Sequence, residues 1–174
     1  NKFVLKILNI VPSYFPAKIY GGVIFSSHHT NLELSKKYKE IKICVSTTTA
    51  NGSNRLYNKS TIKKFKHNYI INYYFDEIID RFSFDFLIDL RKNIKASDII
   101  HFQDIFSFFS ITGIIFAQLF GKKILISPRG VLNKWSLNSK KTFLKKIIFF
   151  IFFKNKKFFW HATSIIEKND LHLL

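Results

Sequence analysis

The chain alternates between short apolar runs and longer helix-like stretches, an order that predicts a repeated strand–helix fold. The apolar runs lie at 3–11, 41–47, 68–75, 97–102 and 122–127, and their near-continuous apolar character is typical of strands buried on both faces. Helix-like stretches occupy 23–38, 82–96 and 106–120, and a long basic and apolar helix is predicted at 139–160. This alternation predicts an α/β fold, a Rossmann-like domain with a central parallel sheet and helices on both faces.

Turn and cap residues agree with these boundaries. Asn51-Gly52 signals a turn after the second strand, and Gly121 signals the end of a helix. Ser164 and Glu167 fit a capping box that opens one more helix. No internal repeat divides the chain, so its 174 residues are expected to form one domain.

Glycines and polar residues follow four of the predicted strands. Gly21 and Gly22 follow the first strand and 47–49 follow the second. His101 and Asp104 sit at the end of the fourth, and 128–130 follow the fifth. Ligands of parallel α/β sheets bind beyond the carboxyl ends of the strands, where these positions converge. The sequence therefore predicts a binding site at that edge of the sheet.

The adjacent glycines Gly21 and Gly22 stand at the start of the first predicted helix. Glycine lets a ligand approach the main chain closely, and free N–H groups at the start of a helix favour an anion. Neither G-x-G-x-x-G nor G-x-x-x-x-G-K-[ST] is present. From spacing alone, a phosphate site and a tight turn after a proline-containing loop both fit.

Positive charge is high and concentrated in the second half of the chain. The net charge is +17, from 28 basic and 11 acidic residues, and the segment 105–166 has no acid and eleven Lys or Arg. Such a charge favours an anionic partner, with a drift of composition toward lysine as the alternative. Cys44 is the only cysteine, which excludes an internal disulfide and favours a reducing compartment.

Several segments together resemble a known enzyme family. "PSYFPAKIYGG", "SDIIHFQDIFSFFS", "SPRGVLNKW" and "HATSIIEKNDL" occur in the order and spacing of the N-terminal domain of family-4 glycosyltransferases, which have the two-domain GT-B fold. The resemblance covers 1–174 and implies the acceptor-side half of a retaining glycosyltransferase, with the C-terminal donor-binding domain absent from this chain. It implies transfer of a sugar from a nucleotide-sugar donor to a saccharide or lipid-linked acceptor in surface polysaccharide biosynthesis, without a metal or other cofactor. This half alone is expected to be inactive.

The resemblance also implies roles for individual residues. It implies that Gly21 and Gly22 contact the donor phosphate. His101 and Arg129 are the implied catalytic residues, and Asp104 and Trp135 are the implied residues of the acceptor cleft. An arginine fork could pair with phosphate or an acidic sugar. A structural role for His101, a salt bridge for Arg129 and a core position for Trp135 remain open. His28 and His29 lack further ligands at a useful spacing, so no zinc site is expected.

The predicted helix at 139–160 carries seven consecutive apolar residues, 147–153, flanked by lysines. This run is too short to span a bilayer, which takes about 20 apolar residues. A helix lying in an anionic membrane surface fits better, with Lys141, Lys145 and Lys146 at the headgroups. Packing against the sheet is the alternative. Together with membrane contact, the resemblance implies a cytoplasmic location, peripheral at the inner face of the cell membrane.

Two other functions compete with the glycosyltransferase interpretation. The charge and the many aromatic residues fit a nucleic-acid-binding module. However, no recognition motif is present, and most aromatics lie in apolar runs expected to be core, so nucleic acid is not the expected partner. A membrane-surface module without catalysis is the third interpretation.

Overall fold

The computed structural model describes residues 4–65, 68–75, 82–132 and 158–172. Most of the predicted helix at 139–160 lies outside these residues, as do Trp135, Lys141, Lys145 and Lys146. The prediction of a membrane-surface helix therefore stays a prediction. In the described part of the chain, no helix combines the length and apolar character that a membrane crossing needs.

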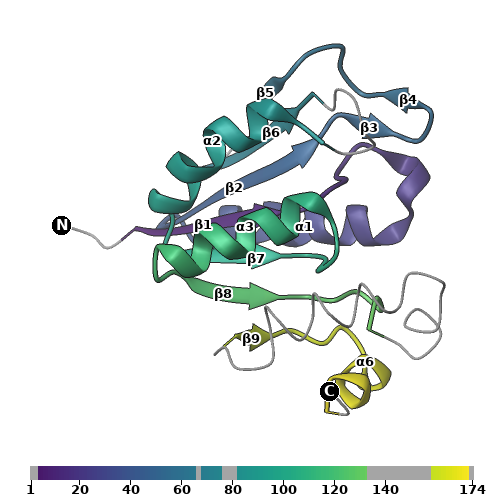
Figure 1. Ribbon diagram of the computed structural model, residues 1–174, viewed down its shortest axis with the longest axis vertical. Helices are drawn as coiled ribbons and strands as arrows, with labels where there is room; N and C mark the ends of the chain where they lie inside the picture. Colours follow the sequence, from purple (N-terminus) through teal and green to yellow (C-terminus); the bar gives the residue numbers. More distant parts are fainter. Residues whose placement is uncertain (1–3, 66–67, 76–81, 133–157, 173–174) are drawn as a thin grey trace.

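The described residues form an α/β fold in which strands and helices alternate along the chain (Figure 1). The strands are β1 (Leu5–Ile10), β2 (Ile41–Thr48), β3 (Ala50–Asn51), β4 (Asn54–Arg55), β5 (Thr61–Phe65), β6 (Tyr69–Tyr74), β7 (Ile99–Phe102), β8 (Lys123–Ile126) and β9 (Phe159–Trp160). The helices are the 3-10 turn η1 (Lys18–Tyr20), α1 (Gly22–Lys37), α2 (Phe84–Lys95), α3 (Phe108–Leu119) and α6 (Ile165–His172).

Seven strands form one sheet in the order β5-β6-β2-β1-β7-β8-β9. All neighbours pair in parallel except β5, which runs antiparallel to β6. The central strand β1 pairs with β2 on one side and β7 on the other, so that Asn9 lies between Val45 and His101. This sheet confirms the predicted Rossmann-like α/β fold.

Helices cover both faces of the sheet (Figure 1). On one face, Phe86 and Leu90 of α2 and Phe109 of α3 pack with Leu8 and Ile100 of the sheet in one apolar core. On the other face, a second core contains side chains of β2 and β6, and α1 packs against it through Leu32 and Leu34. Burial of these apolar stripes is the main stabilisation of such layers.

Two strands of the sheet differ from the sequence prediction. The antiparallel strand β5 was not predicted, because the centre of its sequence TIKKF is polar and exposed. Phe159 and Trp160, assigned from sequence to the long helix, form β9 instead and pair with Leu125 and Ile126 of β8. A strand of two residues has too short an apolar pattern to be separated from the end of a helix by sequence.

The predicted boundary signals are largely confirmed. Asn51 ends β3 and Gly52 begins the turn to β4, and Gly121, with a φ of 61°, follows the end of α3. Ser164 Oγ accepts a hydrogen bond from the N–H of Glu167 (3.1 Å) and so caps α6. The carboxylate of Glu167 does not complete the predicted capping box, since it binds the N–H of Thr163 (2.6 Å) rather than that of Ser164.

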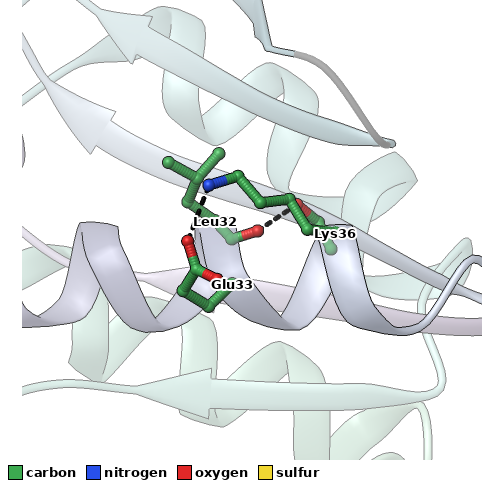
Figure 2. A network of polar contacts seen from close by, with 4 residues as sticks. Leu32, Glu33 and Lys36 are labelled. Atoms are coloured by element: carbon green, nitrogen blue, oxygen red, sulfur yellow. Dashed lines mark hydrogen bonds and ion pairs between the residues drawn. The ribbon is translucent and has the colours of Figure 1, made fainter.

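The carboxyl end of α1 carries an ion pair between Lys36 Nζ and Glu33 Oε1 (2.6 Å), shown in Figure 2. Both side chains are exposed. It is the only ion pair formed between two described residues. The described part of the chain therefore offsets little of its positive charge by pairing with its own acids.

Candidate functional site

The carboxyl ends of the parallel strands meet at one edge of the sheet, toward which the arrowheads in Figure 1 point. The loop and turn η1 that lead into α1 lie at this edge, as do the segments that follow β2, β7 and β8. The path of the backbone therefore confirms that the predicted positions converge on one edge of the sheet. These positions are Gly21, Gly22, His101, Asp104 and Arg129.

The two adjacent glycines have different roles in the backbone. Gly21 precedes α1 with φ 82° and ψ −167°, a conformation that is almost restricted to glycine. Gly22 is the first residue of α1 and has no such requirement. A β-carbon at either position would meet no atom within 4 Å, so the amino end of α1 faces open space. Gly21 provides no side-chain cap to the first N–H groups of the helix.

Arg129 lies against the second turn of α1. Its Nη2 donates to Ser27 Oγ (3.1 Å) and to Gln103 Oε1 (3.5 Å), and Ser27 Oγ also donates to Gln103 Oε1. The guanidinium is half-buried, and burial lowers the pKa of Arg129, while Glu167 and Tyr14 act to raise it. An arginine still carries its proton at neutral pH. A positive charge is therefore held in place at this edge.

The backbone around Arg129 is fixed by Glu167. Arg129 has a φ of 56°, in the left-handed region that non-glycine residues rarely occupy, and Gly130 follows with a φ of 80°. The buried carboxylate of Glu167 accepts hydrogen bonds from the N–H of Gly130 (2.8 Å) and from Thr163. Burial raises the pKa of Glu167, but these hydrogen bonds outweigh it and hold the pKa below its usual value. The start of α6 thus supports the Arg129 turn.

Buried polar atoms without a hydrogen-bond partner gather at the same edge. Among the described residues they include Asn9 Oδ1 near the end of β1, Ser13 Oγ in the next loop, Thr47 Oγ1 near the end of β2, and Arg129 Nε after β8. An unsatisfied buried polar group costs about 1–3 kcal/mol, so each calls for an explanation. These atoms are buried, so only a polar ligand or water that enters the interior at this edge could pair with them, and the donor on Arg129 requires an acceptor such as a phosphate oxygen.

His101 is hydrogen-bonded within the protein. Its Nε2 lies 2.8 Å from Ser127 Oγ, which in turn lies 2.9 Å from His161 Nδ1. Burial, with the charges of Arg129 and His161, lowers the pKa of His101 to about 4. The imidazole is therefore neutral near pH 7. Ser127 is fully buried and links two histidines, which favours the structural interpretation of His101 that the sequence left open.

A chain of buried hydrogen bonds supports the loop after β1. Tyr14 OH accepts from Asn31 Nδ2 of α1 (2.6 Å) and from Tyr69 OH of β6 (3.0 Å), and Tyr69 OH lies 2.9 Å from His28 Nδ1. Burial raises the pKa of Tyr14 to about 12 despite these contacts and the nearby Arg129, so the phenol stays neutral. His28 is thus a core residue.

The remaining predicted site residues lie elsewhere or are engaged in local contacts. Asp104 Oδ1 accepts from Ser107 N (3.4 Å) and Ser107 Oγ (2.9 Å) at the start of α3. The predicted alternative of a salt bridge for Arg129 is not found among the described residues. No cluster of metal-binding side chains occurs in the described ranges.

Sequence reasoning missed Ser27 and Gln103, the two side chains that hold Arg129. Gln103 gave a partial signal, because it directly follows the fourth predicted strand, between His101 and Asp104. Ser27 gave none, since it lies 102 residues from Arg129 in the sequence.

No protein-family model and no curated protein sequence matches the chain. Among solved structures, the chain is similar to that of DNA processing protein A from Helicobacter pylori, described for its single-stranded DNA binding mode. The two share 15% sequence identity, with a TM-score of 0.40 over 97% of this chain and 80% of that chain. Values this low transfer no function from one protein to the other.

The comparisons correct the identification made from sequence. The predicted membership of the family-4 glycosyltransferases is wrong: neither a family model nor a curated protein sequence matches the chain. The predicted sugar transfer therefore loses its support. The same holds for the predicted nucleotide-sugar donor and for the saccharide or lipid-linked acceptor. The motifs misled because a glycine-containing loop, a histidine and an arginine at strand ends suit many α/β proteins that bind anions. Catalytic roles for His101 and Arg129 stay untested predictions.

Proposed function

We propose that the domain binds single-stranded nucleic acid, with a backbone phosphate held between Arg129 and the open amino end of α1. The observation that carries the proposal is the half-buried guanidinium of Arg129, whose Nε has no partner among the described residues. The amino end of α1 is nearby, because Gly22 precedes Ser27 by five residues, about 7.5 Å along the helix axis. The positive end of the helix dipole and the guanidinium both favour an anion there.

The total charge favours a polyanion over a small phosphate compound. The chain carries +17, and Lys36 with Glu33 is the only ion pair between described residues. Many neutralised phosphates per molecule give strong attraction and release counterions from the nucleic acid. The exposed Lys18 begins η1, four residues before the start of α1, and adds a positive charge to this part of the chain.

The position of Arg129 favours a single strand over a duplex. Its guanidinium is half-buried beneath the strand ends, where Ser27 and Gln103 hold it. A rigid double helix presents its phosphates on a convex surface, whereas a flexible strand can bend to bring one phosphate into a recess. DNA processing protein A, described above, binds single-stranded DNA. The proposal depends only on the residues of this chain.

The test is fluorescence anisotropy with a labelled oligothymidine and a duplex of the same length, in increasing salt. Arg129→Gln should weaken single-strand binding about tenfold or more, since a hydrogen bond to a charged group is worth about 1.5–3 kcal/mol. It should also reduce the slope of log K against log salt by about 0.7. Lys36→Gln is the matched control, because it removes the same charge at the opposite end of α1 (Figure 2).

Gly22→Asp separates binding from folding. An acidic side chain suits the first turn of a helix, so the free energy of unfolding should not fall. The added carboxylate would occupy the open space where the phosphate is proposed to lie, and single-strand binding should weaken about tenfold. Equal affinity of the native protein for single strand and duplex, or equal losses for Arg129→Gln and Lys36→Gln, would contradict the proposal.

A further inference from the structure

A cavity of about 260 Å³ lies at the opposite edge of the sheet, near the amino ends of β1 and β2. Residues from β1, β2, β6 and the end of α2 line it, among them Lys6, Lys42, Cys44, Ile70, Asn93 and Ala96. Its volume lies just below the range of about 300–1,000 Å³ that is usual for ligand sites. Only a small ligand would fit.

Two lysines lie side by side at this cavity. Lys6 of β1 and Lys42 of β2 are register partners, and neighbouring strands are about 4.8 Å apart. Both side chains are exposed, and within the described ranges neither ammonium has a hydrogen-bond or ion-pair partner. The Asp98 carboxylate next to them accepts the backbone N–H of Lys6 (2.8 Å). Like charges directly opposite each other destabilise a sheet, so an anion between the two would relieve their repulsion.

The next row of the same sheet face is apolar. Leu8 is the register partner of Cys44, and Cys44 is the register partner of Ile70. Leu8 is buried, whereas Cys44 and Ile70 are half-buried. Burial, with the charge of Asp89, raises the pKa of Cys44 to about 11, so its thiol is neutral at physiological pH and belongs to the apolar wall. The cavity thus joins an uncharged apolar surface to a polar rim that holds two lysines and, next to them, the Asp98 carboxylate.

We infer that this cavity binds a small carboxylate with an apolar body, its carboxylate at Lys6 and Lys42 and its body against Leu8, Cys44 and Ile70. The apolar row favours the burial of hydrocarbon. The paired ammonium groups select a negative headgroup over a neutral or positive one. The cavity lies at the amino ends of the strands, whereas the Arg129 site lies beyond their carboxyl ends, so the two sites are separate.

Cys44 provides a reporter for this site, because it is the only cysteine in the chain and lines the cavity. The experiment follows the rate at which N-ethylmaleimide modifies Cys44, by mass spectrometry, as sodium octanoate is added. Octanol and octylamine, with the same hydrocarbon body, are the neutral and positive controls. Octanoate should slow modification in a saturable manner, with at least tenfold greater potency than either control.

Variants assign the headgroup contact. Lys6→Gln and Lys42→Gln should each raise the half-protecting octanoate concentration about tenfold, and Lys36→Gln, on an exposed helix surface, should leave it unchanged. Octanoate should also raise the midpoint of thermal unfolding of the native protein, because it binds only the folded state. Protection by octanol equal to that by octanoate, or unchanged protection in both lysine variants, would overturn the proposal.

Discussion

His101 should make the protein less stable in mild acid. Its folded-state pKa is about 4, against an ordinary value of 6.5, so the unfolded chain binds a proton more readily than the folded protein between these values. Stability from this group is therefore fully present above pH 6.5 and is lost as the pH falls toward 4. Within this window, each drop of one pH unit lowers the free energy of unfolding by about 1.4 kcal/mol. The free energy of unfolding should fall by about 2 kcal/mol from pH 7 to pH 5, and by about 3 kcal/mol at pH 4.

The assay is urea unfolding followed by tryptophan fluorescence at pH 7, 6 and 5, for the native protein and His101→Gln. Glutamine can still hydrogen-bond Ser127 but does not titrate, so the variant should lose about 2 kcal/mol less than the native protein between pH 7 and pH 5. Burial also lowers the pKa of His28, so the loss of stability that protonation of His28 causes in acid should remain in the variant. His29→Gln, at an exposed histidine, is the control and should follow the native protein. Parallel pH dependences of the native protein and His101→Gln would refute the reasoning.

Four further substitutions test the packing and backbone described above by urea unfolding. Gly113→Ala should lower the free energy of unfolding by about 1–3 kcal/mol, because the new β-carbon would lie 2.6 Å from Cε1 of the buried ring of Phe102; an unchanged value would mean that the ring can move. Glu167→Gln should cost about 2 kcal/mol through its lost charge-assisted hydrogen bonds, and a loss below 0.5 kcal/mol would show that they are dispensable. Gly21→Ala should cost about 1–3 kcal/mol while Gly22→Ala costs nothing measurable, since only Gly21 has a positive φ; equal effects would contradict this assignment.

The sequence predicted the parallel core of the sheet because its strands are buried on both faces and read as apolar runs. β1, β2, β6, β7 and β8 and the helices α1, α2 and α3 lie close to their predicted ranges. β5 escaped prediction because an edge strand needs no apolar centre. β9 escaped because only its pairing with β8 separates two residues of strand from the end of a helix.

The candidate site was predicted as a location but not as a set of contacts. The rule that ligands bind at the carboxyl edge needs only the order of strands, so Gly22 and Arg129 could be placed there from sequence. The hydrogen bonds of Arg129 to Ser27 and Gln103 depend on how α1 and the turn after β8 meet in three dimensions. No local pattern encodes a contact between residues 102 positions apart.

The antiparallel strand β5 determines how the sheet ends. An edge strand exposes unpaired main-chain groups that can recruit a strand from another molecule. Here Lys63 and Lys64 occupy the exposed centre of β5, beside the exposed Ile62. A second molecule that paired along this edge would bring its own two lysines against them. The border of the sheet therefore resists edge-to-edge aggregation by electrostatic repulsion, a protection that should weaken as salt screens the charges.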